Sequence, residues 1–193
     1  KKIIYIVFVK TLFLTESLGR KMGGLSSSVL HLAICLSKKY PDNEYRILIQ
    51  KESNDEGIEN DYLIPPNLTI ERVSKIGIRL YPISFMMQFR LHIFNPDIVY
   101  IKGIWKQTSL AGYIWKKTNP NKILIVSPAG MLQPVNLIKR KILKKITIFL
   151  IEKPLLELSD AVHAVSEIEK KDLLNLGFNI NKIFYIPEGI PTL

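Results

Sequence analysis

Between residues 95 and 190 the chain alternates short apolar runs, rich in β-branched residues, with segments of helical spacing. Such runs are typical of strands that are buried on both faces of a parallel sheet. Each run ends in a loop-forming signature, at 102–105, 127–132, 166–169 and 187–190. Because open parallel sheets bind ligands at the carboxyl ends of their strands, we expect these four loops to carry the function.

The same patterns predict the other elements. Strands are expected at 3–9, 45–50, 68–73, 97–101, 122–126, 161–165 and 182–186. Helices are expected at 24–40, 83–94, 107–117, 137–158 with a kink near Pro154, and 167–176, and a long loop is expected at 10–23. The predicted fold class is therefore α/β, a Rossmann-like open parallel sheet with helices on both faces.

The length and composition limit the organisation of the chain. With 193 residues, 47% of them hydrophobic, one sizeable core can form, and we expect one domain over residues 1–193. The single cysteine, Cys35, lies among helical apolar positions and is read as packing. The absence of a disulfide framework, of a signal peptide and of an apolar run of roughly 20 residues predicts a cytoplasmic location.

A net charge of +10 makes the surface attractive to phosphates on lipids, nucleic acids or small molecules. The segment 137–150 places basic residues opposite an apolar side when it is wound at about 3.6 residues per turn. The basic side consists of Arg140, Lys141, Lys144 and Lys145. This pattern favours docking on an anionic membrane surface about as well as it favours an ordinary solvated helix face. Nucleic acid is a poor match, since the basic residues are not interleaved with aromatic ones.

Few residues stand out for chemistry. Gly23 and Gly24 precede a helix, where a backbone can approach a phosphate closely, although a glycine pair is about as often simple turn geometry. The chain lacks G-x-G-x-x-G and the P-loop pattern, which argues against dehydrogenases and NTPases. Trp105, beside Gly103 at a strand end, is a candidate ligand contact.

The remaining candidates have structural explanations of equal or greater weight. Glu188 lies in a Pro-x-Gly loop, where a carboxylate either meets ligand hydroxyls or is simply solvated. Ser166 and Glu169 fit a capping box. The three histidines share no metal-ligand spacing, so we predict no metal site and read all three as structural or surface residues.

Taken together, the loops resemble the amino-terminal half of a retaining glycosyltransferase of the GT-B fold, of glycosyltransferase family 4. The resemblance rests on the order and spacing of several modest motifs. They are Gly23-Gly24 before a helix, Pro96-Asp97-Ile98-Val99, Gly103 to Trp105, Ser127-Pro128 with Gly130-Met131-Leu132, the basic helix leading to Glu152, Ala164-Val165-Ser166 with Glu169, and Ile186-Pro187 with Gly189-Ile190.

The resemblance implies an enzyme of two domains, with transfer in the cleft between them and neither a metal nor another cofactor required. This domain would bind the acceptor, and Gly23 and Gly24 would face the phosphates of the donor. The residues implied to line the cleft, together with the loop carboxylate and its neighbour, are Lys102, Gly103, Trp105, Ser127, Ala129, Gly130, Met131, Glu188 and Gly189.

Three positions depart from the family pattern. Lys102 and Ala129 stand where members commonly have histidine, or histidine or arginine, and Glu188 stands where they commonly have asparagine. No catalytic residue is therefore assigned, although Lys102 could balance a phosphate or a developing charge. The donor-binding C-terminal domain is expected to be absent from this chain, so the isolated domain is predicted to be inactive.

The leading hypothesis is the acceptor-binding domain of a hexosyltransferase that uses a nucleotide sugar. Its acceptor would be a saccharide or lipid-linked saccharide in bacterial surface polysaccharide or lipopolysaccharide synthesis, and the protein would be cytoplasmic or peripheral on the inner face of the membrane. The alternative is a non-catalytic Rossmann-like module that binds a sugar phosphate or a partner protein.

Overall fold

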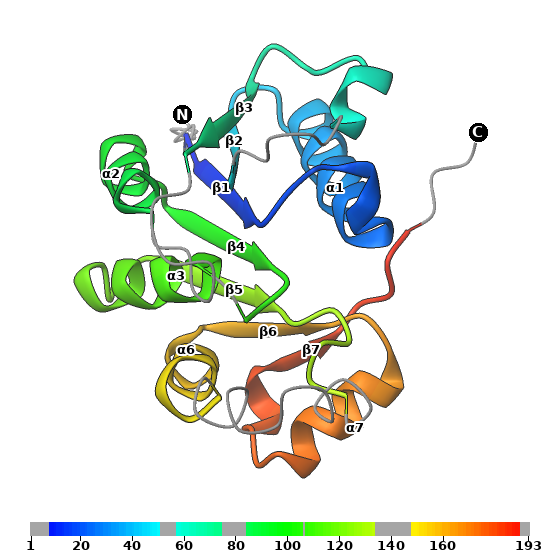
Figure 1. The fold of residues 1–193 in the computed structure, drawn as a ribbon, viewed down its shortest axis with the longest axis vertical. Helices are drawn as coiled ribbons and strands as arrows, with labels where there is room; N and C mark the ends of the chain where they lie inside the picture. The colour runs from blue at the N-terminus through cyan, green and yellow to red at the C-terminus, as the bar shows by residue number, and fades with distance from the viewer. Residues whose placement is uncertain (1–7, 51–56, 75–83, 106, 134–147, 190–193) are drawn as a thin grey trace, which may run out of the picture.

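The computed structural model describes residues 8–50, 57–74, 84–105, 107–133 and 148–189. Within these residues, seven parallel strands form one sheet in the order β3-β2-β1-β4-β5-β6-β7 (Figure 1). The strands are β1 (Lys10–Thr15), β2 (Glu44–Gln50), β3 (Leu68–Val73), β4 (Ile98–Lys102), β5 (Ile123–Ser127), β6 (Ala161–Ala164) and β7 (Ile183–Tyr185). The predicted α/β class with an open parallel sheet is confirmed.

Helices lie on both faces of this sheet (Figure 1). The described helices are α1 (Gly24–Lys39), α2 (Phe85–Phe94), α3 (Gln107–Thr118), α6 (Lys153–Leu158) and α7 (Glu167–Asn175). Short helical turns are η1 (Arg20–Met22), η2 (Ile58–Asp61), the π-helical turn η3 (Ile148–Glu152) and η4 (Ile180–Lys182). Apart from the region before Ser17 and the segment 137–158, the predicted boundaries of strands and α-helices fall within two residues of the observed ones.

The core divides into two clusters because side chains alternate between the faces of a strand. Leu12 and Leu14 of β1 join the cluster that packs against α2, α3, α6 and α7. Phe13 points the other way, into the cluster under α1. In β4, Tyr100 lies on the α1 side, whereas Val99 and Ile101 lie on the opposite side. By the same alternation, Lys102 is expected on the side of Tyr100.

The first strand corrects one prediction. The uninterrupted apolar run 3–9 was expected to be the central strand and 10–15 a loop, but the central strand is β1 at Lys10–Thr15. Residues 3–7 lie outside the described part, and Phe8 is 52% exposed. A charged residue at position 10 misled the prediction, because Lys10 sits at the open end of the strand, 3.6 Å from Glu44. The following residues, 11–15, are buried between β2 and β4.

Cys35 is exposed on α1, not packed, because the buried face of α1 runs through Val29, Leu30 and Ala33. The basic residues Arg140, Lys141, Lys144 and Lys145 lie outside the described residues. Of the helix predicted at 137–158, the structure describes a π-turn and then α6, with Pro154 in the first turn of α6, where a missing N–H is tolerated.

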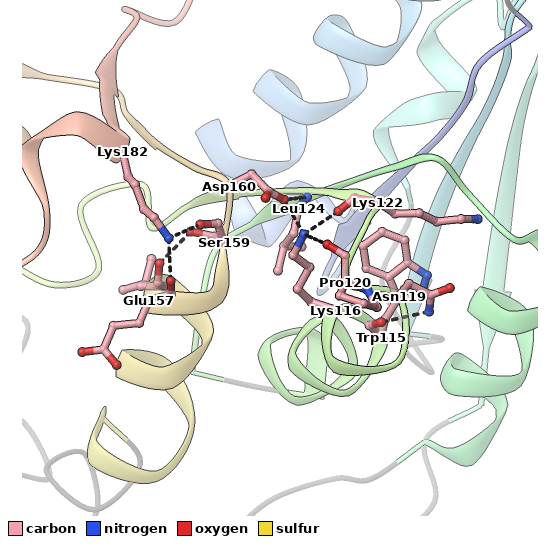
Figure 2. A network of polar contacts seen from close by, with 11 residues as sticks. Trp115, Lys116, Asn119, Pro120, Lys122, Leu124, Glu157, Ser159, Asp160 and Lys182 are labelled. Atoms are coloured by element: carbon pink, nitrogen blue, oxygen red, sulfur yellow. Dashed lines mark hydrogen bonds and ion pairs between the residues drawn. The ribbon is translucent and has the colours of Figure 1, made fainter.

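A polar network ties the carboxyl end of α3 to the start of β5 and β6 (Figure 2). The buried Lys116 ammonium donates to the carbonyls of Pro120 and Lys122, at 2.9 and 2.5 Å, and to Asp160 Oδ2 at 2.7 Å. Asp160 Oδ2 also accepts from the backbone N–H of Leu124 at 2.7 Å. All of these contacts join parts of the scaffold, so we assign them a structural role.

Candidate functional site

The loops that follow β1, β4, β5, β6 and β7 meet at one edge, because all of these strands run parallel (Figure 1). The sequence patterns placed functional residues at this edge. The structure shows that two of them, Lys102 and Ser127, are the last residues of strands β4 and β5 and not loop residues. Their positions are therefore set by the hydrogen bonds of the sheet.

Lys102 is a buried cation at the end of β4. Its side chain is 2% exposed, its Nζ donates to Ser127 Oγ at 3.3 Å, and it forms an ion pair with the carboxylate of Glu188. Burial lowers the pKa of the ammonium to about 8, and the nearby carboxylate of Glu169 partly offsets this effect. Lys102 therefore places a positive charge at a fixed position at the end of β4, paired with the carboxylate of Glu188.

Strand β6 contributes a histidine that joins β4 to the segment after β7. His163 Nδ1 lies 2.7 Å from the Tyr100 hydroxyl, and Nε2 lies 2.7 Å from the carbonyl oxygen of Ile186. A carbonyl only accepts, so we assign the proton of the neutral ring to Nε2 and the hydroxyl donor role to Tyr100. Burial lowers the pKa of His163, which favours this neutral form. His163 thus holds the backbone just before Glu188.

Glu169 is an additional site residue whose role the capping-box reading missed. Ser166 does cap α7, since its Oγ accepts from the N–H of Glu169 at 3.1 Å. The carboxylate of Glu169 turns instead to the N–H groups of Gly130, at 2.6 Å, and Val165, at 2.8 Å. Its 1% exposure places a buried carboxylate at this edge, where it anchors the loop that follows β5.

The loops after β4 and β5 contact each other through two hydrogen bonds to Met131. Trp105 Nε1 donates to the Met131 carbonyl at 3.3 Å, and the Ile104 N–H lies 3.2 Å from Met131 Sδ. Trp105 and Ala129 adopt positive φ angles of 79° and 54° without being glycine. Such conformations are costly and collect at functional sites.

Glu152 holds the loop after β4 through the backbone of Trp105. It is fully buried, and its Oε1 accepts the backbone N–H of Trp105 at 2.9 Å. Burial raises the pKa of Glu152 to about 7, against the opposing effect of the nearby Ser109 hydroxyl and of the hydrogen bond from Trp105.

A pocket of about 470 Å³ opens beside this edge, between α1 and the segment 186–189. Lys102, Glu188 and Gly189 line it, together with Tyr100 and His163. The other predicted cleft residues do not line this pocket. Ser127 is fully buried at the end of β5, whereas the loops after β4 and β5 contain Gly103, Trp105, Ala129, Gly130 and Met131.

Gly23 and Gly24 begin α1 on the loop after β1 and also lie outside the lining of the pocket. A Cβ at either glycine would meet nothing within 4 Å, so the space in front of them is open. Among the residues that the structure describes, no group of acidic, histidine or cysteine side chains could hold a metal ion. In the same part of the chain, no helix has the length and apolar character to cross a membrane.

Tyr100, His163, Glu152 and Glu169 were not predicted as site residues. A signal existed for Tyr100, because period-two alternation puts it on the same side of β4 as Lys102. The contacts of the other three depend on which strands are neighbours, and no local pattern encodes that.

A parallel sheet whose carboxyl edge carries a charged, loop-lined site defines a Rossmann-like domain of the kind that makes up the amino-terminal half of a GT-B fold. The model of Glycosyltransferase Family 4 matches residues 22–192, and the chain belongs to this family. No curated protein sequence matches the chain.

Solved structures support the same fold. The Anabaena protein Alr3699/HepE in complex with UDP and glucose aligns with a TM-score of 0.64 at 16% identity, over 94% of this chain and 45% of that one. A putative UDP-N-acetylglucosamine 2-epimerase from Listeria monocytogenes gives a TM-score of 0.60 at 17% identity, over 92% and 44% of the two chains. The UDP-GlcNAc 2-epimerase of Methanocaldococcus jannaschii gives 0.57 at 18%, over 91% and 44%. The chain thus spans a little under half the length of these structures.

Proposed function

We propose that this chain is the acceptor-binding domain of a glycosyltransferase that moves a sugar from a nucleotide sugar to a saccharide or lipid-linked acceptor in bacterial surface polysaccharide synthesis. The observation that carries the proposal is the family match over residues 22–192, combined with a pocket beside the carboxyl edge of the sheet that Lys102 and Glu188 help to line. The pocket volume of about 470 Å³ is in the range of small-molecule sites.

The donor side of the reaction is assigned to a second domain, since the similar structures are about twice as long as this chain. The open space before Gly23 and Gly24 suits the close approach of donor phosphates to the start of α1. One similar structure holds UDP and glucose, so UDP-sugars are the first donors to test. Under this proposal the isolated domain of residues 1–193 does not turn over.

A transfer assay tests the proposal. Radiolabelled UDP-glucose and UDP-N-acetylglucosamine are incubated with oligosaccharide or lipid-linked acceptors, using residues 1–193 alone and a chain that also carries a donor-binding half. We expect transfer only from the longer chain. Transfer by residues 1–193 alone contradicts the assignment of the donor site to the second domain.

The alternative is a non-catalytic module that binds a sugar phosphate or a partner protein. The ion pair between Lys102 and Glu188 favours this alternative. The two residues stand where family members commonly have histidine and asparagine, and the Glu188 carboxylate occupies the position next to the Lys102 ammonium. A longer chain that binds sugar phosphates but transfers nothing from any nucleotide sugar supports this alternative.

We also propose that the protein is cytoplasmic and docks peripherally on the inner, anionic face of a membrane. The chain carries a net charge of +10. On α2, Phe85, Phe89 and Ile93 form an apolar stripe at helical spacing, 75%, 52% and 58% exposed. Apolar stripes accompanied by basic charge are suited to the membrane interface.

A further inference from the structure

The two partners of the ion pair at the pocket differ in burial and in how firmly the chain holds them. Lys102 is fixed at the end of a strand, with 2% of its side chain exposed, whereas the Glu188 side chain is 34% exposed and lies on the segment after β7. That segment is held before Glu188, where the Ile186 N–H donates to the Ala164 carbonyl at 3.1 Å and His163 binds the Ile186 carbonyl. The pair can therefore open by movement of Glu188 without movement of Lys102.

Loss of its paired carboxylate destabilises a buried ammonium, because part of the desolvated charge is then uncompensated. If Glu188 leaves, Lys102 keeps only the attraction of the nearby Glu169 carboxylate, so an incoming anion that takes the place of Glu188 is favoured. The pocket gives that anion a route, since it borders both Lys102 and Glu188. Its wall on α1 adds the side chains of Lys38 and His31. The surroundings of Lys102 therefore fit a small ligand with an anionic group.

We propose that Glu188 occupies the place of a ligand phosphate, and that a sugar phosphate monoester entering the pocket pairs with Lys102 and displaces the Glu188 carboxylate. The site then contains its own competitor, which the ligand has to expel. This inference deepens the acceptor-side function proposed above and rests on it for the sugar part of the ligand. It adds the phosphate group and the competition with Glu188.

Charge favours phosphate over carboxylate. A phosphate monoester carries about −1.5 to −2 charges and three acceptor oxygens. It can accept from Lys102 Nζ, which the bond to Ser127 Oγ at 3.3 Å holds in place at the end of β4. A ligand carboxylate offers no more charge than Glu188, which is tethered at an effective concentration of about millimolar or more.

The test is a calorimetric or NMR titration with glucose 6-phosphate at constant ionic strength, with no nucleotide sugar present. Glu188→Gln removes the competitor, and we expect the phosphate to bind about tenfold more tightly than to the wild type, because apparent affinity rises with the fraction of open sites. Glu157→Gln, an exposed carboxylate on α6, is the matched control and leaves the affinity unchanged. Equal affinity of the Glu188→Gln variant and the wild type overturns the proposal.

Glu188→Gln removes the carboxylate that pairs with Lys102 and can impair folding, so the double variant Lys102→Gln, Glu188→Gln provides a second measurement. This variant removes both charges of the pair and is expected to bind the phosphate at least about tenfold more weakly than the wild type. Binding equal to that of the wild type overturns the proposal.

Two further ligands test the chemistry. Glucose should not bind more tightly to Glu188→Gln, and glucuronate should gain less than the phosphate; equal gains overturn the assignment to phosphate. Because no transfer is measured, an inactive longer chain contradicts the proposed function alone, whereas an unchanged affinity contradicts this inference alone.

Discussion

The carboxylate of Glu152 accepts the backbone N–H of Trp105 at 2.9 Å and so holds a tryptophan whose φ angle is 79°. The two residues come from segments that are far apart in the sequence, at the end of η3 and in the loop after β4. A positive φ at a bulky residue is unfavourable and persists only when its surroundings enforce it. The hydrogen bond to Glu152, which is fully buried, helps to hold Trp105 in this conformation.

We expect the stability of the protein to fall between about pH 4.5 and 7 because of Glu152. Its pKa is raised from 4.5 to about 7, so the folded state holds a proton that the unfolded state releases, and stability is lost as pH rises through this window. Glu152→Gln keeps an acceptor for Trp105 without the charge. Above pH 7 this variant should be more stable by up to about 3 kcal/mol. Urea unfolding at pH 5 and pH 8 measures the difference, and an equal gap at both values contradicts the prediction.

Lys116→Met should destabilise the fold by about 2–4 kcal/mol, because it leaves two carbonyls and the Asp160 carboxylate without their buried cation (Figure 2). The neighbouring Lys117 is exposed and serves as the control, so Lys117→Met should change stability only slightly. Thermal denaturation of both variants provides the comparison. A similar small effect at both positions would show that the network contributes little.

Gly112→Ala should cost about 1–2 kcal/mol even though alanine is the better helix former. A Cβ at this position of α3 collides with Cδ1 of Ile101 in β4, so the helix has to move away from the sheet or Ile101 has to change its rotamer. Gly24→Ala is the control, since its Cβ meets nothing within 4 Å. Chemical denaturation distinguishes the two; equal stability means that the core accommodates the methyl group.

Gly24→Ala should nevertheless impair the function that we propose. In a chain that carries the donor-binding half, the added methyl group stands where donor phosphates would approach α1, and we expect the apparent affinity for the nucleotide sugar to fall about tenfold or more. The melting temperature should stay the same, because no protein atom is displaced. Normal donor kinetics in this variant would remove Gly24 from the donor site.

Membrane docking predicts co-sedimentation with vesicles that contain anionic lipid. Changing Arg140, Lys141, Lys144 and Lys145 together to glutamine should release the protein, since each basic residue near the headgroups contributes about 1 kcal/mol. Phe89→Ser on the α2 stripe should weaken binding separately. The control changes Lys38, Lys39, Lys117 and Lys171, all exposed, to glutamine. If the two fourfold variants bind equally weakly, binding depends on net charge and not on the four predicted residues. If Phe89→Ser binds like the wild type, the α2 stripe has no part in docking.

Most of the architecture follows from local patterns. Apolar runs bounded by glycine and proline predicted β2 to β7 closely, because buried parallel strands leave a strong compositional signal. The prediction failed at β1, where two apolar runs lie next to each other and a charged residue separates them. Pairing with β2 and β4 selects the second run, and those partners are distant in the sequence.

The candidate site was predictable only in part. Lys102, Ser127 and Glu188 stood out because strand ends and Pro-Gly loops can be recognised in the sequence. Their contact could not be predicted, since it joins positions 86 residues apart. The same limit applies to His163, whose bonds to Tyr100 and Ile186 span three elements, and to Glu169, which looks like a helix cap until its carboxylate is followed to Gly130.

The sequence by itself determined the alternation of strands and helices, the parallel sheet and the edge at which its loops gather, because these depend on side-chain periodicity and turn residues close together along the chain. The tertiary structure alone decided which run forms β1, which buried charges meet and which carboxylate supports Trp105. Those outcomes depend on burial, since only the packed sheet removes Lys102, Glu152 and Glu169 from water. Away from water, the interactions of these side chains with their partners become stronger, and a missing partner becomes costly.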